Sequence, residues 1–235
     1  MKEVSRKQYY VFSPWLRAFH WIMVASIVTL FLTGILIATP LQSLNSEPIF
    51  SSTYVDLIRD IHFTVAFVFT FSFILRIYGF IVNKGDRLFP HFLSGKFYAD
   101  AIDVAMHYML VKGAHASFIR NPMARLSYAL LYVLVFIEFI TGFAIYFSTN
   151  PDGILGTLSS YVILLCGTEM MVHLIHHYVA WAIILFAIGH LYMVIRAEFM
   201  EGESEISSMF SGAKFLIHTP EDADDMPEGH RHHLI

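Results

Sequence analysis

Four histidines lie inside long apolar stretches of the sequence, where ionisable side chains are costly and by default indicate function. They are His20, His62, His176 and His190. Neutral imidazole is a common metal ligand, and two imidazoles on facing helices supply both axial ligands of a six-coordinate b-type haem. A haem held in this way carries electrons, because no coordination position is left for dioxygen. For any one histidine taken alone, an interhelical hydrogen bond is the structural alternative.

The elements that must position these histidines are four apolar stretches. Of the 235 residues 56% are hydrophobic and 14% charged, whereas soluble domains are about 25% charged, so a bilayer is the expected solvent. Since a transmembrane helix needs about 20 largely apolar residues, we predict an all-α integral membrane protein, a four-transmembrane-helix bundle enclosing two b haems. Its single domain covers residues 1–200, with spans at about 14–38, 54–82, 125–147 and 169–196.

Local signals mark where several elements begin. Ser13-Pro14, the capping-box-like Thr53-x-x-Asp56 and Thr168-Glu169 are typical helix starts. The apolar segment 154–166 is too short to span and is expected at the surface, and the amphipathic segment 98–111 at the interface. Residues 201–235 read as a flexible cytoplasmic tail, and no removable signal peptide is predicted.

The basic residues predict the orientation. Fourteen of the 15 Lys and Arg lie on one side: in the N-terminal segment, in the loop between the second and third spans, in the segment after the fourth, or, like Arg17 and Arg76, inside a span toward its end on that side. Only Arg59, near the other end of the second span, lies on the opposite side. The positive-inside rule therefore places both termini of this multi-pass protein in the cytoplasm. The net charge of −4 says little about partners beyond membrane lipid, and no nucleic-acid partner is expected.

This topology sorts the four histidines into two levels. His20 and His190 fall near the cytoplasmic ends of their spans, and His62 and His176 near the outer ends. Each level therefore holds one candidate pair of haem ligands. His176 and His190 are 14 residues apart, which is about 21 Å along a helix, so two stacked haems would cross most of the roughly 30 Å hydrocarbon core.

Two further patterns concern the surroundings of these ligands. Gly34 and Gly142, each preceded by Thr, stand in similar settings, FLTGILI and FITGFAI, which hint at a weak repeat. They are candidates for contact with porphyrin, and ordinary packing of helices through small residues is an equal alternative. In the cluster His173-x-x-His176-His177 only one outer ligand is needed. We prefer His176, because its depth best matches that of His62.

Three other residues carry open questions. Glu138 interrupts the third span, and a neutral, hydrogen-bonded acid is our first choice, with proton uptake or a haem-propionate neighbour as alternatives. Arg59 is a candidate partner for a haem propionate, unless a nearby aspartate neutralises it. The lone Cys166 excludes an iron–sulfur cluster held by this chain alone.

Several motifs together resemble a known family. They are R-x-x-H-W at 17–21, T-G in the first span, R-D-I-H-F at 59–63, L-R-I-Y at 75–78, N-P-M-A at 121–124, and H-L-I-H-H with G-H-L-Y-M within 173–193. In these the chain resembles the b-type cytochrome subunit of membrane-bound nickel–iron hydrogenases, which is related to the gamma subunit of membrane formate dehydrogenase. The resemblance runs from about Trp15 to Met200.

The resemblance implies a function for the chain and the residues that carry it out. The family's haem ligands fall on His20 and His190 for the cytoplasmic-side haem and on His62 and His176 for the periplasmic-side haem. Electrons would come from the iron–sulfur small subunit of a hydrogenase, whose large subunit also lies on the periplasmic face, and would reduce menaquinone or ubiquinone. The quinone site would involve His115 and Asn121, where a histidine can supply protons, although a solvated His and a turn-forming Asn-Pro are the plain alternative. The chain is thus expected to be the quinone-reducing subunit of a hydrogen:quinone oxidoreductase, not a hydrogenase by itself.

Other classes of protein fit less well. A formate dehydrogenase or thiosulfate reductase membrane subunit, or a stand-alone diheme cytochrome b, shares the histidine pattern. A di-iron membrane desaturase would need many histidines gathered on one face, whereas this chain has one H-x-x-H-H box and places its other membrane histidines at both levels. A membrane anchor without cofactor would lack haem absorbance.

Overall fold

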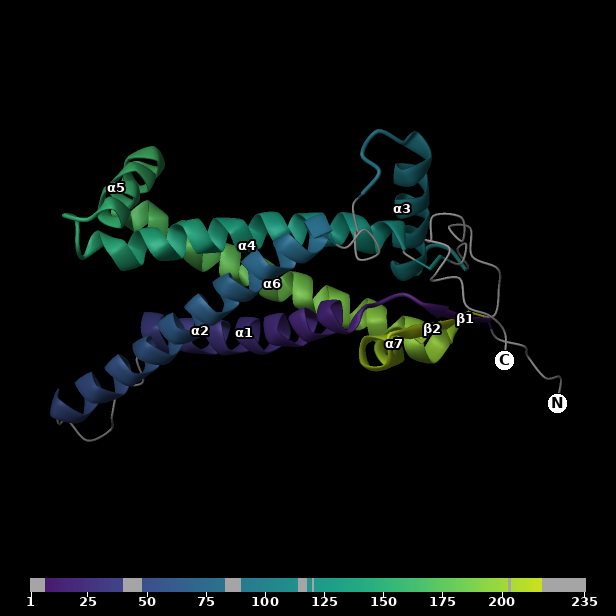
Figure 1. The fold of residues 1–235 in the computed structure, drawn as a ribbon, viewed down its shortest axis with the longest axis horizontal. Coiled ribbons are helices and arrows are strands. Elements are labelled where there is room, and N and C mark those ends of the chain that lie inside the picture. The colour runs from purple at the N-terminus through teal and green to yellow at the C-terminus, as the bar shows by residue number, and fades with distance from the viewer. Residues whose placement is uncertain are drawn as a thin grey trace. The chain divides into compact units, whose positions relative to one another are not determined.

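Four long apolar helices dominate the computed structural model, which describes residues 7–39, 48–82, 90–113, 118–119, 121–202 and 204–216. They are α1 (Pro14–Ala38), α2 (Pro48–Val82), α4 (Pro122–Ser148) and α6 (Glu169–Arg196) (Figure 1). Each is long and apolar enough to cross a membrane. The prediction of four helices with the length and composition to span a membrane is therefore confirmed.

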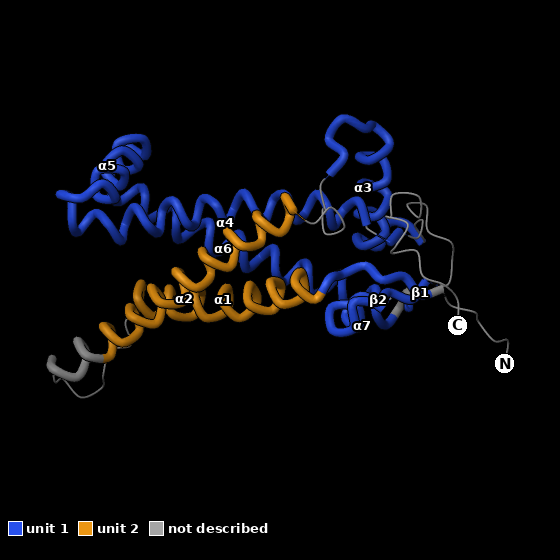
Figure 2. Tube along the Cα trace, viewed as in Figure 1, with its two compact units in different colours: residues 1–13, 85–235 blue, residues 14–84 orange. Residues whose placement is uncertain are grey.

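The helices group into two compact units, shown in separate colours in Figure 2. Residues 14–84 form the α1/α2 unit, in which α1 packs along α2. Residues 1–13 and 85–235 form the α4/α6 unit, in which α4 packs along α6. His20 and His62 belong to the first unit, and His176 and His190 to the second. The structure thus defines the surroundings of each histidine within its own unit.

The helix starts follow the local signals at two of the three predicted places. α1 begins at Pro14, and Thr168 caps α6, its hydroxyl oxygen accepting the backbone N–H of Met171 at 3.2 Å. The third prediction was wrong, because α2 begins at Pro48 rather than beside Thr53. Proline is itself favoured in the first helical turn, where its missing N–H costs no hydrogen bond.

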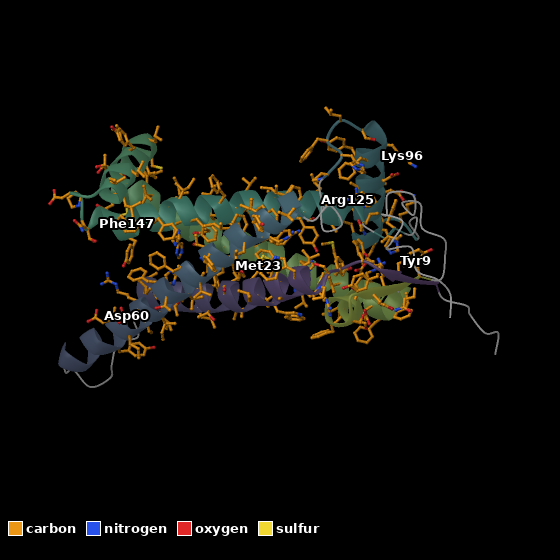
Figure 3. All side chains as sticks on the ribbon, in the orientation of Figure 1. Tyr9, Met23, Asp60, Lys96, Arg125 and Phe147 are labelled. Atoms are coloured by element: carbon orange, nitrogen blue, oxygen red, sulfur yellow. The ribbon has the colours of Figure 1, made fainter. Side chains whose placement is uncertain are left out.

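The α4/α6 unit carries smaller elements at both ends of α4 (Figure 1). Helix α3 (Gly95–Tyr108), the predicted amphipathic segment, packs on α4 at one end, and α5 (Ile154–Cys166) packs on α4 and α6 at the other. Arg125 and Phe147 mark these two ends of α4 in Figure 3. The buried Ser159 hydroxyl donates to the Ala144 carbonyl at 2.5 Å and ties α5 to α4.

The segment after α6 is more ordered than predicted. It forms a π-helical turn, η2 (Ala197–Glu201), then α7 (Glu205–Ser211) and β2 (Ala213–Leu216), and β2 pairs antiparallel with β1 (Lys7–Tyr10). Lys214 is 1% exposed, and its ammonium donates to the Glu205 carboxylate at 2.5 Å and the Phe118 carbonyl at 3.1 Å. The expectation of a flexible tail is therefore wrong for residues 205–216, because residues 205–211 form a helix and residues 213–216 pair with the distant strand β1. Residues 217–235 lie outside the described ranges.

Candidate functional site

In the α1/α2 unit, one hydrogen bond defines the state of His62. Its Nδ1 lies 2.8 Å from the hydroxyl oxygen of Thr33 on α1. That hydroxyl donates its single hydrogen to its own helix, to the carbonyls of Thr29 at 2.7 Å and Leu30 at 3.1 Å, so toward the ring it can act only as acceptor. With the hydroxyl hydrogen used in this way, we infer that His62 carries its proton on Nδ1. The lone pair is left on Nε2, the form that binds a metal.

In the α4/α6 unit, the same arrangement holds His176. Its Nδ1 lies 3.0 Å from the hydroxyl oxygen of Thr141 on α4, and Thr141 donates to the Ile137 carbonyl at 2.8 Å. Both threonines are buried, Thr33 at 8% and Thr141 at 3% exposure. The weak repeat in the sequence thus corresponds to one contact made twice, between threonine and histidine of adjacent helices.

The two glycines of the repeat face these same histidines. A β-carbon on Gly34 would lie 3.6 Å from Cε1 of His62, and one on Gly142 would lie 3.0 Å from Cε1 of His176. Within each unit the missing side chain lets an imidazole approach the neighbouring helix. The helix-packing alternative therefore has direct support at both positions, and contact between these glycines and a porphyrin stays a prediction.

The two glycines should differ in their tolerance of alanine. We expect Gly142→Ala to push the His176 ring away, since 3.0 Å is too close for a methyl group, and to lower the haem content of the purified chain. Gly34→Ala introduces an ordinary contact and should leave the haem content near that of the parent. Haem per chain, measured by the pyridine haemochrome method, checks both variants. Equal losses in the two would show that the ring contacts do not govern the site.

Glu138, whose role the sequence left open, contacts His176 directly. Its Oε2 lies 2.5 Å from Nδ1 of His176, and its side chain is 14% exposed. The hydrogen bond predicted for this acid is therefore present, with a candidate haem ligand as its partner, and the predicted neutral state of the acid stays a prediction. Sequence reasoning could flag the buried acid but had no signal for its partner on another helix.

The other two histidines of the outer cluster have different partners. His173 lies 4.0 Å from the carboxylate of Glu169, one turn earlier on α6. Nε2 of His177 accepts the indole N–H of Trp181 at 3.2 Å, so its lone pair is engaged. Only His176 has Nδ1 held by α4, which supports the choice of His176 as ligand.

His20 and His190 have mainly aromatic surroundings. His20 meets the ring of Trp21 edge-on at 5.2 Å, and His190 stacks on Phe186 with a centroid separation of 6.3 Å and an interplanar angle of 3°. Flat aromatic neighbours suit a position next to a porphyrin. The pairing of His20 with His190, like that of His62 with His176, joins residues of different units and stays a prediction.

The remaining predicted residues have structural partners or lie outside the described ranges. The side-chain oxygen of Asn121 caps α4 by accepting the backbone N–H groups of Met123 at 2.9 Å and Ala124 at 3.4 Å, as expected for an Asn-Pro helix start. His115 lies outside the described residues. The guanidinium of Arg59 sits 5.9 Å from the centroid of the Phe63 ring.

These donors fit a bis-histidine haem better than a metal cluster. Within the described ranges, no group of three or more His, Cys, Asp or Glu side chains could hold a metal ion. Two of the candidate ligands, His62 and His176, instead have Nδ1 held by a hydrogen bond, which is usual for a metal-binding histidine. Such imidazoles could hold a b haem, which would supply one-electron redox chemistry, without further protein ligands.

Comparisons with known proteins agree with this chemistry. The profile of prokaryotic cytochrome b561 matches residues 11–212. A probable Ni/Fe-hydrogenase B-type cytochrome subunit of Rhizobium leguminosarum bv. viciae is 32% identical, covering 92% of each chain. The corresponding protein of Azotobacter vinelandii is 30% identical, over 97% of this chain and 95% of the relative. A probable Ni/Fe-hydrogenase 1 B-type cytochrome subunit of Escherichia coli K12 is also 30% identical, over 87% of this chain and 89% of the relative. The chain belongs to the prokaryotic cytochrome b561 family, and is a membrane b-type cytochrome similar to the B-type cytochrome subunits of Ni/Fe hydrogenases.

Proposed function

We propose that this chain anchors a respiratory nickel–iron hydrogenase to the bacterial inner membrane and passes electrons from the iron–sulfur subunit through two bis-histidine b haems to a quinone. The observation that carries the proposal is the repeated contact of a threonine hydroxyl with Nδ1 of His62 and of His176, which would leave Nε2 as the lone-pair nitrogen. An imidazole prepared in this way is suited to hold haem iron. The relatives' names supply the hydrogenase partner.

The four histidines form two ligand pairs in this proposal. His62 and His176 hold the periplasmic-side haem, and His20 and His190 hold the cytoplasmic-side haem. When bound, each haem supplies one-electron redox chemistry. The chain orients the imidazoles through Thr33 and Thr141, and its apolar helices keep water away from the iron. The separation of His176 and His190 by 14 residues of α6 supports two haems at different depths.

Both termini lie in the cytoplasm in this arrangement. Pairing of β1 with β2 keeps the segment before α1 beside the segment after α6, as an even number of spans requires. The bias of Lys and Arg toward the same side supports its assignment to the cytoplasm. The hydrogenase small and large subunits then dock on the periplasmic face, next to the His62/His176 haem and near Arg59, which we propose as a propionate partner.

The quinone site is proposed at the cytoplasmic side, in the segment leading into α4. There His115 would supply protons to a reduced menaquinone or ubiquinone. The oxygen of Asn121 is used by the helix cap, so its amide N–H₂ is the group that would donate to a quinone carbonyl. Electron flow from the periplasmic-side haem to this site would reduce quinone with protons from the cytoplasm.

Co-expression with the hydrogenase subunits tests the proposed function. The membrane complex should purify with a nickel–iron large subunit and two haem b per cytochrome chain by pyridine haemochrome assay, and hydrogen should reduce both haems. Purified chain without haem absorbance would establish a plain anchor and refute the proposal. Co-purification with a formate dehydrogenase catalytic subunit instead would assign the chain to that class of complex.

A further inference from the structure

The two threonine–histidine contacts differ in one residue. In each repeat the hydroxyl of a buried threonine lies within hydrogen-bond distance of Nδ1 of a histidine on another helix of the same unit, His62 in one unit and His176 in the other. Three residues before the threonine, the first repeat has Leu30 and the second has Glu138. A substitution of leucine by an acid inside a membrane span is costly unless the acid has a use.

The carboxyl of Glu138 is placed for one contact. Its Oε2 is 2.5 Å from Nδ1 of His176, closer than the 3.0 Å from that Nδ1 to the Thr141 hydroxyl. Its Oε1 is buried and has no hydrogen-bond partner in the part of the chain that the structure describes. The Nδ1–H of His176 therefore faces two acceptors, and the nearer one is a carboxyl oxygen.

We propose that Glu138 is a positioning residue that tunes the haem held by His176. By accepting the Nδ1–H, a carboxylate fixes the ring orientation and makes Nε2 a stronger donor to the iron, as in carboxylate–histidine–metal triads. A stronger donor stabilises ferric iron over ferrous iron, so Glu138 lowers the midpoint potential of that haem. His62, which lacks such an acid at the matching position, does not receive this effect. The inference rests on the proposed function, because it takes His176 to be a haem ligand.

Three variants of the holo-protein test this role. Glu138→Leu gives the second repeat the residue of the first, and Glu138→Gln keeps the size and an acceptor oxygen but removes the charge. Glu169→Gln is the matched control: it removes one carboxylate from the same unit, near His173, without contacting His176. The readouts are haem content, the midpoint potential of each haem by redox titration, and the low-spin ferric EPR signals.

We expect both Glu138 variants to retain two haems, to raise one midpoint potential and to shift one EPR signal, with the larger change in Glu138→Leu. The second haem and the Glu169→Gln protein should stay as in the parent. Two retained haems with unchanged potentials and EPR signals would overturn the inference while leaving the proposed function intact. If the Glu138→Leu protein loses a haem, the Glu138→Gln protein tests the inference in its place. Unshifted midpoint potentials in Glu138→Gln would show that Glu138 only packs against His176 and does not tune the haem. Retention of both haems in His176→Ala would instead refute the ligand assignment itself.

Discussion

Replacing both His62 and His176 by alanine should remove no more haem than replacing either one alone. A b haem needs both axial imidazoles for stable six-coordinate binding, so each single variant is expected to lose one of the two haems and to keep the other. If the two histidines hold the same haem, the second substitution has nothing left to remove. The double variant of His62 and His190 should lose both haems. Pyridine haemochrome quantification per purified chain, with EPR to count low-spin signals, distinguishes these patterns.

Histidines of the same cluster provide the controls for this experiment. His173→Ala and His177→Ala should keep two haems, since His173 contacts Glu169 and His177 accepts the Trp181 indole N–H. Loss of a haem in either control, with retention in His176→Ala, would move the ligand to the neighbouring position. Additive loss in the double variant of His62 and His176 would contradict the pairing.

Replacing His20 or His190 by alanine should abolish hydrogen-dependent quinone reduction while the partner hydrogenase still reduces an artificial dye. The cytoplasmic-side haem is the electron donor to quinone in the proposed path, and without it electrons stop about 21 Å along the helix axis from that level. The remaining haem should still be reduced by hydrogen, because its own electron supply is untouched. Quinone reduction, dye reduction and the haem difference spectrum, all measured on the same complex, give the three readouts.

Variants of the His62/His176 pair test the order in which electrons pass through the two haems. In His62→Ala the haem nearest the iron–sulfur subunit is missing, so hydrogen should reduce neither quinone nor the remaining haem at a useful rate. Quinone reduction that survives in His20→Ala would place the quinone elsewhere. A remaining haem that hydrogen cannot reduce in that variant would reverse the proposed order.

Much of the secondary structure could be predicted because its determinants are local. A bilayer demands about 20 apolar residues in succession, and Pro14 and Thr168 are recognisable helix starts, as the structure bears out. The start of α2 was harder to predict, because Pro48 and Thr53 are both acceptable helix starts. The structure has the longer helix, which begins at Pro48. The order in residues 213–216 depends on β1, some 200 residues away along the chain, so no local pattern could reveal it.

The candidate site was likewise predictable only where its features are local in the sequence. Sequence alone determined that His20, His62, His176 and His190 are chemically unusual, because imidazoles in apolar spans are rare at any position along a helix. Only the tertiary structure decided which hydroxyl faces Nδ1 of His62 and of His176, and which acid touches His176. Those facts depend on the rotation of each helix about its axis and on the helix it packs against, which bring Thr141 to a residue 35 positions away. Such contacts join residues on different helices, and apolar patterns shared by all faces of a membrane span do not specify them.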